Sequence, residues 1–218
     1  MREFKLQLKT LGLATVGWSH PVAAKADVIF ARRYDHKGGY IIYIPGSSFK
    51  GALRSSASRI AEVYGFRSCG ETLANRLHKQ GEVDLNTCAV CHVFGYPGSG
   101  FSRIVVDDFI PDGKEVRVSR ITHVGLDDAS LTKSEHKLYT VEVVPPNTIF
   151  KGSIEVEDAL EGGGLKLLIL ALAELRLGRI GKNTMVDLRI DQGLEVLDEV
   201  LGSETARPFK GLGEWAWV

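Results

Sequence analysis

The segment IPGSSFKGALRS, residues 44–55, concentrates residue types that bind anions. Gly46 and Gly51 allow a ligand to approach the backbone closely, and Ser47 and Ser48 offer hydroxyl donors. A helix that starts here would also present its N–H groups and the positive end of its dipole. We therefore expect this segment to be able to hold a phosphate group.

Two basic residues extend the same motif. Lys50 and Arg54 are four positions apart, so on a helix they share one face, from which both could reach a sugar-phosphate backbone. The spacing is not that of a P-loop, and neither is that of GRIGKNT (178–184). A serine-capped helix that carries two solvated basic residues is the alternative, and the residues alone leave it open.

The cysteines form a second group of chemically active residues. Cys88 and Cys91 make a Cys-x-x-Cys pair, and Cys69 and His78 precede it. These four residues supply the thiolate and imidazole ligands of a tetrahedral structural Zn²⁺ site, with His92 as a competing fourth ligand. A redox-active pair and three unlinked buried cysteines are the alternatives. The odd cysteine count argues against a disulfide framework.

The elements that would position these residues alternate between strands and helices. The alternation of apolar and polar residues over 4–16 and the apolar run 40–44 predict strands. The amphipathic stretch that follows Ser47 or Ser48 predicts a helix over about residues 49–64. Further strands are expected within 103–111, 116–124, 138–157 and 179–190, and further helices over 162–178 and 193–202.

This order of elements is typical of an α+β protein with a ferredoxin-like core. We expect residues 1–218 to form one domain with insertions at about 66–95 and 112–137. The chain is 44% apolar, enough for a core, and its 27 basic residues balance its 27 acidic residues. Polyanion binding must therefore come from local basic clusters. Neither a signal peptide nor a membrane-spanning run is evident, which predicts a cytoplasmic protein without membrane contact.

The motif at 44–55 resembles the signature of the RAMP superfamily, the repeat-associated proteins of CRISPR systems. It is similar to the version in the backbone subunit of type III effector complexes. CAVCHVFG (88–95) resembles the Cys-x-x-Cys-x-x-Phe-Gly element of that subunit, and SRIVVDDF (102–109) resembles its next strand. YTVEVVPPNTIFKGSIEVE (139–157) is similar to its Glu-x-x-Pro-x-x-Thr-x-Phe strand pair. Together the four pieces cover most of residues 1–190.

The resemblance implies an RRM-like core with a zinc-binding insertion and a protruding thumb hairpin. It also implies a protein that polymerises with copies of itself along a CRISPR guide RNA and presents the guide to a target RNA. Other type III CRISPR effector subunits would be its partners. Phosphate contacts position RNA without reading its sequence, which suits any guide. The residues that would grip the guide backbone are Ser47, Ser48, Lys50, Gly51 and Arg54.

In the resembled family, an aspartate in the loop after the first strand cleaves the target RNA, within a Gly-Ala-x-Asp-x-Pro-x-x-Arg pattern. AKADVIFAR (24–32) places Asp27 at this aspartate and Arg32 five residues later. Mg²⁺ or another divalent cation would assist the cleavage. Asp35 is a second candidate. The departures from the pattern are Ala24, Lys25 and Ile29, and they leave an inactive scaffold open as an alternative.

The resemblance implies two further RNA contacts. VRVSRITHV (116–124) would form part of the thumb, where Arg120 and His123 could touch RNA. LRLGRIGKNT (175–184) resembles the glycine-rich segment that follows the second helix and forms a second phosphate grip. The basic residues of this grip would be Arg176, Arg179 and Lys182.

Three functions therefore remain open. The chain could be a backbone subunit that cleaves target RNA, or a catalytically inactive RNA-binding scaffold subunit. It could also be an endoribonuclease that processes precursor CRISPR RNA, although FKGLG (209–213) is a poor match for the glycine loop of such enzymes. An unrelated zinc-containing domain would show no salt-dependent RNA binding.

Overall fold

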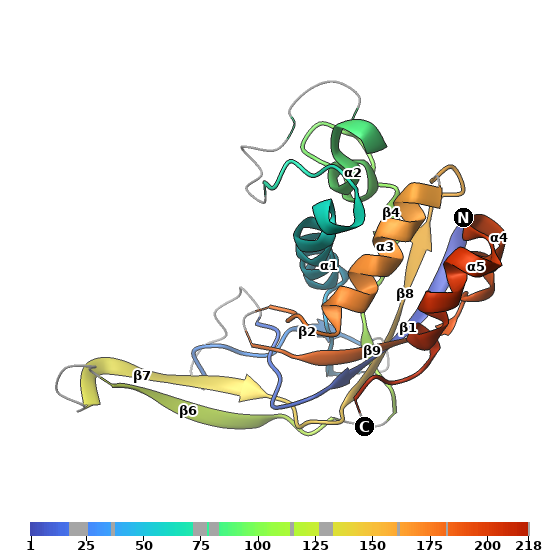
Figure 1. The fold of residues 1–218 in the computed structure, drawn as a ribbon. Coiled ribbons are helices and arrows are strands. Elements are labelled where there is room, and N and C mark those ends of the chain that lie inside the picture. The colour runs from blue at the N-terminus through green and yellow to red at the C-terminus, as the bar shows by residue number, and fades with distance from the viewer. Residues whose placement is uncertain are drawn as a thin grey trace.

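A computed structural model describes most of the chain (Figure 1). In the part of the chain that the structure describes, no helix is both long enough and apolar enough to cross a membrane. The described residues are 1–17, 26–35, 38–71, 78, 83–113, 116–126, 133–160, 162–181 and 183–217. The strands are β1 (Arg2–Thr10), β2 (Arg32–Tyr34), β3 (Tyr40–Ile42), β4 (Ile104–Val106), β5 (Ile110–Pro111), β6 (Ser119–Leu126), β7 (Lys133–Val143), β8 (Ile149–Val156) and β9 (Val186–Gln192). The helices are α1 (Gly46–Ile60), α2 (Leu85–Phe94), α3 (Gly162–Leu175), α4 (Glu195–Leu201) and α5 (Ser203–Ala206), with 3₁₀ turns at Glu62–Tyr64 and Arg207–Gly213.

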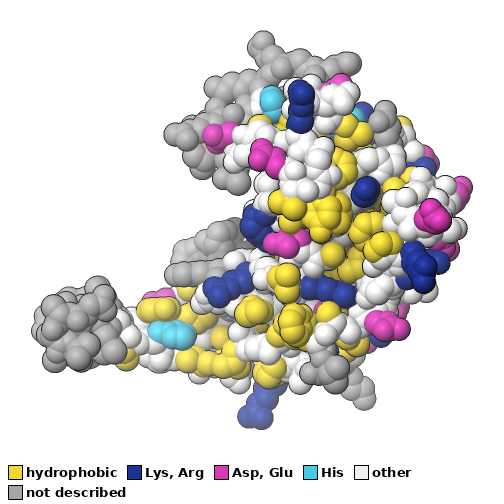
Figure 2. Space-filling model, viewed as in Figure 1, with side chains coloured by type: hydrophobic (Ala, Val, Ile, Leu, Met, Phe, Trp, Pro, Cys, Tyr) yellow, Lys and Arg dark blue, Asp and Glu magenta, His cyan; other side chains and the backbone are white. Residues whose placement is uncertain are grey.

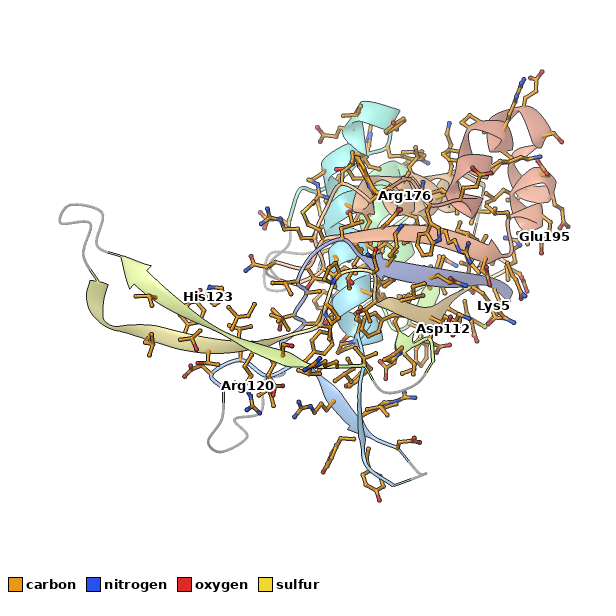
Figure 3. All side chains as sticks on the ribbon, turned by 90° about the horizontal axis from the view of Figure 1, so that it is seen from below. Lys5, Asp112, Arg120, His123, Arg176 and Glu195 are labelled. Atoms are coloured by element: carbon orange, nitrogen blue, oxygen red, sulfur yellow. The ribbon has the colours of Figure 1, made fainter. Side chains whose placement is uncertain are left out.

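The largest sheet is antiparallel and has the strand order β4-β8-β1-β9, with β5 also paired to β8. Because successive side chains of a strand point to opposite faces, the alternating sequence of β1 gives the sheet one apolar face. Phe4, Leu6 and Leu8 are buried on that face, whereas Lys5 lies on the opposite, polar face (Figure 3). The α+β class and the strand predicted at the N-terminus are therefore confirmed.

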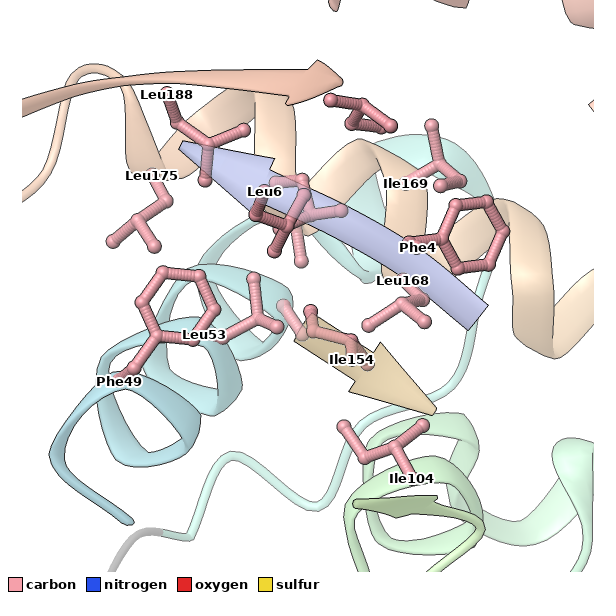
Figure 4. Packing of buried hydrophobic residues seen from close by; sticks show 14 of the residues in the cluster. Phe4, Leu6, Phe49, Leu53, Ile104, Ile154, Leu168, Ile169, Leu175 and Leu188 are labelled. Atoms are coloured by element: carbon pink, nitrogen blue, oxygen red, sulfur yellow. The ribbon is translucent and has the colours of Figure 1, made fainter. Parts of the chain in front are cut away.

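Helices α1 and α3 cover the apolar face of this sheet and form the core with it (Figures 1 and 4). Phe49 and Leu53 of α1 and Leu168 and Leu175 of α3 are buried against sheet residues such as Ile154. Burying a side chain of this size contributes roughly 1.5–3 kcal/mol. The core thus fixes α1, and with it the glycine-serine-lysine motif, on the sheet.

A long hairpin of β6 and β7 projects from the body of the molecule (Figure 1). Figure 2 shows that the surface is hollowed between this hairpin and the helical part of the molecule. The hairpin is anchored at its base, where Val28 forms a parallel bridge to Val141 and Ala14 pairs with Val144. It begins within the insertion expected at 112–137, but β7 continues beyond that range to Val143.

The start of α1 differs from the sequence-based expectation. The helix begins at Gly46 with Pro45 as its N-cap residue, and no side chain caps it. Ser47 and Ser48 therefore lie inside the first turn, and the prediction that one of them caps the helix was wrong. The first residue of the helix has to be a glycine, because a β-carbon at position 46 would come within 2.2 Å of the Val106 carbonyl oxygen.

Other elements also differ from the expected ones. We predicted no strand between the first strand and the apolar run 40–44, but β2 lies there and pairs with β3. The expected strand 103–111 is divided into β4 and β5 by a bridge between Phe109 and Ile44. The segment 66–95, which lacks a clear period, contains α2. Its non-helical break at Cys88 explains why no helical repeat is visible there.

Candidate metal centre and nucleic-acid interface

The four predicted metal ligands lie together. The candidate ligand atoms of Cys69, His78, Cys88 and Cys91 all lie within 4.8 Å of one another, and all three cysteines are free thiols. The Sγ atoms of Cys69 and Cys91 are 3.7 Å apart. A tetrahedral Zn²⁺ with Zn–S bonds of about 2.3 Å places its sulfur ligands about 3.8 Å apart. The spacing therefore suits a tetrahedral metal ion.

The backbone around the Cys88–Cys91 pair stabilises thiolate sulfur. Cys88 Sγ accepts hydrogen bonds from the backbone N–H groups of Cys69 and Cys91, each at 3.4 Å. A hydrogen bond from the Cys91 thiol, together with these N–H groups, lowers the pKa of Cys88 to about 4. The same hydrogen bond raises the pKa of Cys91, its donor. The two N–H donors thus favour the thiolate form of Cys88, which is the form that binds a cation.

The two candidate histidine ligands have different surroundings. His78 Nε2 is buried and has no hydrogen-bond partner among the described residues, which would be costly unless it binds something. The His92 ring nitrogen Nδ1 instead lies 3.0 Å from the Val83 carbonyl oxygen, and His92 is outside the cluster. The residues present fit a metal ion held by three cysteines and His78.

The anion-binding motif forms one face of α1. Ser47, Lys50, Gly51 and Arg54 follow the spacing i, i+3, i+4, i+7 and therefore line up along the helix, whereas Ser48 points away from this row. A β-carbon added at Gly51 would meet no atom within 4 Å. This glycine leaves the backbone of the exposed face open to a ligand.

Lys50 is held across the gap between α1 and β4. Its Nζ donates to Ser102 Oγ and, at 3.1 Å, to the carbonyl oxygen of Ile104. Burial lowers the pKa of Lys50, and the nearby positive charge of Arg54 lowers it further. Among the described residues, neither cation forms an ion pair with a carboxylate.

Arg54 connects the α1 motif to the metal-ligand cluster. Its guanidinium donates to the Gly95 carbonyl oxygen at 2.6 Å and to Cys91 Sγ at 3.1 Å. Its Nε is buried without a partner among the described residues. Three thiolates around a divalent cation carry net negative charge, which Arg54 would partly balance. The two sites predicted separately from the sequence are therefore neighbours.

Asp27 is exposed at the base of the hairpin. Its Oδ2 accepts the Thr140 backbone N–H at 2.6 Å, while its own backbone N–H donates to the Thr140 carbonyl oxygen at 2.9 Å. Oδ1 has no hydrogen-bond partner among the described residues. Asp35 lies elsewhere, in the turn between β2 and β3, where its N–H donates to Gly39.

The two predicted hairpin residues lie on β6 (Figure 3). His123 is exposed and stacks on Tyr139 of β7, with ring centroids 5.0 Å apart. Arg120 lies closer to the base of the hairpin, where its guanidinium is 3.5 Å from Glu142 Oε1. Alternation along the strand places these two residues on opposite faces of the hairpin.

The expected second phosphate grip is dispersed. Arg176 is largely buried, and its guanidinium donates to the carbonyl oxygens of Leu188 (2.7 Å) and Glu214 (2.5 Å). Arg179 is exposed in the loop after α3. Lys182 lies outside the described residues.

Sequence reasoning missed the role of Glu142. This carboxylate is buried, accepts the Phe30 N–H at 3.3 Å and pairs with Arg32 at 2.8 Å and with Arg120. It thereby joins the segment after Asp27 to the hairpin. The available signal was an acidic residue inside the apolar run YTVEVV, since an acidic residue there must be paired.

Comparison with known proteins gives one family and one fold. The chain is similar to a solved chain from a structure titled "Type IV-B CRISPR Complex": the likeness covers 86% of this chain and 90% of that chain, with a TM-score of 0.59 and 17% sequence identity. At that identity the likeness shows a shared fold. No curated protein sequence matches the chain. The family model of the RAMP superfamily matches residues 21–186, most of the chain and all four motifs described above, so the chain belongs to the RAMP superfamily.

Proposed function

We propose that this chain is an RNA-binding subunit of a CRISPR effector complex, and that the exposed face of α1 holds the backbone of the guide RNA. The observation that carries this proposal is the arrangement of Lys50 and Arg54. Two cations are held side by side, one of them half-buried, without a carboxylate partner in the described part of the chain. The metal-thiolate cluster beside Arg54 would balance part of its charge, and a phosphate group would supply the counter-charge that Lys50 lacks and accept the remaining N–H donors of both cations.

The other residues of this face support the same role. Ser47 offers a hydroxyl donor in the first turn, and Gly51 lets a sugar-phosphate backbone come close to the helix. The contacts read no base, which is what a subunit serving many guides requires. Arg120 and His123 on the hairpin, and Arg179 beyond α3, remain candidates for additional contacts, as does Lys182. Arg176 already donates to backbone carbonyl groups, so we expect it to support the fold first.

More specifically, we propose that the chain is the backbone subunit of a type III complex. This subunit would polymerise along the guide RNA and contact other effector subunits in the cytoplasm. Its support is the resemblance of the four motifs. The element order strand-helix-strand-strand-helix-strand and the sheet order β4-β8-β1-β9 support a ferredoxin-like core within this proposal. Purification with guide RNA would test it, because a type III complex would retain its own set of partner subunits.

We propose that the metal ion is a structural Zn²⁺. Three cysteines and His78 are ligands that Zn²⁺ prefers, and four protein ligands leave no open position for catalysis. Its function would be to fix the segment 66–95 against α1, through the contact between Cys91 and Arg54.

Salt-dependent RNA binding tests the main proposal. Lys50→Ala combined with Arg54→Ala should weaken binding of uridine-rich and adenine-rich RNA equally, by about tenfold or more, and lower the slope of log K against log salt by about two. Lys210→Ala removes one exposed cation, on the 3₁₀ turn Arg207–Gly213, and serves as a control. Unchanged affinity and slope in the double variant would contradict the proposal.

A further inference from the structure

A groove adjoins the α1 face on the side of the 95–106 segment. It measures about 520 Å³, within the range of small-ligand sites. One wall is formed by Gly46, Ser47 and Lys50, and the other by residues that include Phe101 and Ser102. Lys50 is the single charged side chain among the described residues that line it, so the groove favours an anionic ligand.

Phe101 stands at the rim of this groove. Its side chain is 97% exposed, the highest value among the large apolar residues that the structure describes. Single exposed apolar residues are common on proteins and need no explanation by themselves. The position of Phe101 is informative because it lines the same groove as Ser47 and Lys50.

The loop that carries Phe101 is held in a defined shape. Ser99 Oγ donates to the Tyr96 carbonyl oxygen at 2.7 Å and accepts the Tyr96 N–H at 3.0 Å. Gly98 and Gly100 adopt φ values of 91° and 74°, which other residues rarely adopt. The turn therefore holds the backbone that carries Phe101 in a defined shape and presents the ring to solvent.

Charge indicates on which side of Phe101 an RNA strand would lie. A second depression, on the other side of the same loop, is lined by Asp84 and Glu157 as well as by Arg103. In that depression Glu157 is paired with Arg103 and Asp84 adds a further negative charge, whereas the groove beside Lys50 has a lysine and no acidic side chain among its described residues, so it suits phosphate groups better. An RNA strand whose phosphates are held at α1 would thus lie in the groove beside Lys50, with its bases directed towards Phe101.

We propose that Phe101 is a base-stacking site, on which a base of single-stranded RNA packs while the adjacent phosphate lies at Ser47 and Lys50. This inference rests on the proposed function and adds a contact to it. An aromatic ring beside a cationic backbone site is the usual combination in proteins that bind single strands without sequence preference. Stacking is tolerant of sequence because every base has a π-face.

The test compares the full chain and its Phe101 variants for binding to polyuridylate that contains 2-aminopurine, whose fluorescence falls when the base stacks. Phe101→Ala should weaken binding by about tenfold and abolish the fluorescence decrease. Phe101→Trp should retain both, and Phe101→Leu, which keeps the apolar side chain without the ring, should lose both. The slope of log K against log salt should be the same in all variants, because no charge is removed.

The outcomes separate this inference from the proposed function. Full affinity and full quenching in Phe101→Ala or Phe101→Leu would overturn the stacking site while leaving the phosphate grip in place. Absence of salt-dependent binding by the wild-type chain would overturn the proposed function itself. Because Phe101 packs against little else, the variants should melt at the wild-type temperature, and a shared melting temperature shows that altered binding is not caused by unfolding.

Discussion

At Gly51, a substitution that stabilises the helix is expected to weaken RNA binding. Glycine inside a helix costs about 0.5–1 kcal/mol relative to alanine, and the space around Gly51 would accept a β-carbon. We therefore predict that Gly51→Ala raises the melting temperature by about 2 °C. The added methyl group would also cover the backbone that RNA approaches, so RNA affinity should fall severalfold. Thermal melting and fluorescence anisotropy in one buffer measure both effects.

Ser55→Ala is the matched control for this prediction. It lies one turn further along α1, where its hydroxyl donates to the Gly51 carbonyl oxygen, and it also introduces a better helix former. It should raise stability without weakening RNA binding. If Gly51→Ala became more stable and still bound RNA as tightly as the wild type, the close approach of RNA to α1 would be refuted.

The proposed metal ion would stabilise the described residues around its four ligands, Cys69, His78, Cys88 and Cys91. When a residue that hydrogen-bonds to a metal ligand is lost, metal affinity typically falls ten- to hundredfold. Removing a ligand itself should lower the affinity further. We predict that His78→Ala lowers Zn²⁺ affinity by at least about a hundredfold and lowers the melting temperature, since bound metal stabilises the folded state. Metal content after dialysis and thermal melting with and without a chelator measure these changes.

His92→Ala distinguishes the two candidate ligands. His92 contacts the Val83 carbonyl oxygen and lies outside the cluster, so this variant should keep about one metal ion per chain. Loss of the metal in His92→Ala, with retention in His78→Ala, would mean that the cluster is assembled differently.

Glu142 anchors the β6–β7 hairpin to the core. Its carboxylate satisfies the Phe30 N–H and two arginines, and removing it leaves these donors without their partner. We predict that Glu142→Ala lowers the free energy of unfolding by about 2 kcal/mol, as expected for buried hydrogen bonds to a charged group. Urea denaturation measures this, with Glu157→Ala as control. Glu157 forms an exposed pair with Arg103, and its removal should have no measurable effect.

The sequence predicted most elements but not the contacts between them. Alternation in β1 and the helical period of α3 reflect burial on one face, so local patterns reveal them. The break at Cys88 and the pairing of Phe109 with Ile44 depend on residues far apart in the chain, which no local pattern encodes. The metal ligands could be predicted because few residue types bind zinc. The link from Arg54 to Cys91 could not, since it exists only once two elements pack together.

At the scale of the whole molecule, the chain has no net charge, so its proposed RNA binding requires basic residues that lie apart from the acidic ones. Lysine and arginine equal aspartate and glutamate in number, yet the groove beside Lys50 is lined by no acidic residue among those described. Two other depressions carry acidic residues, such as Asp107 and Asp191, while a third is lined by Arg32 and Arg117 and by no acidic residue among those described. An RNA strand would therefore be guided by local fields, and its binding should weaken steeply with salt.

Target cleavage, which the family resemblance implies, would require the whole assembly, because guide and target RNA would have to be paired. Asp27 is our candidate for this reaction: one of its carboxylate oxygens accepts the Thr140 N–H, and the other would be available to a Mg²⁺ ion or a proton. We predict that the complex assembled with guide RNA cuts a complementary RNA at regular intervals. EDTA should stop the cleavage, and Asp27→Asn should slow it by about a hundredfold or more.

Asp35→Asn is the control, because Asp35 is the other aspartate of the same segment and lies in the β2–β3 turn instead of against β7. Asparagine at position 27 keeps an oxygen for the Thr140 N–H, so a loss of cutting would report the missing charge and not a displaced loop. Loss of cutting in Asp35→Asn alone would move the catalytic role to that turn. An intact target in the wild-type complex, despite guide binding, would show a scaffold whose altered loop, with Ala24, Lys25 and Ile29 at the departing positions, no longer supports the reaction.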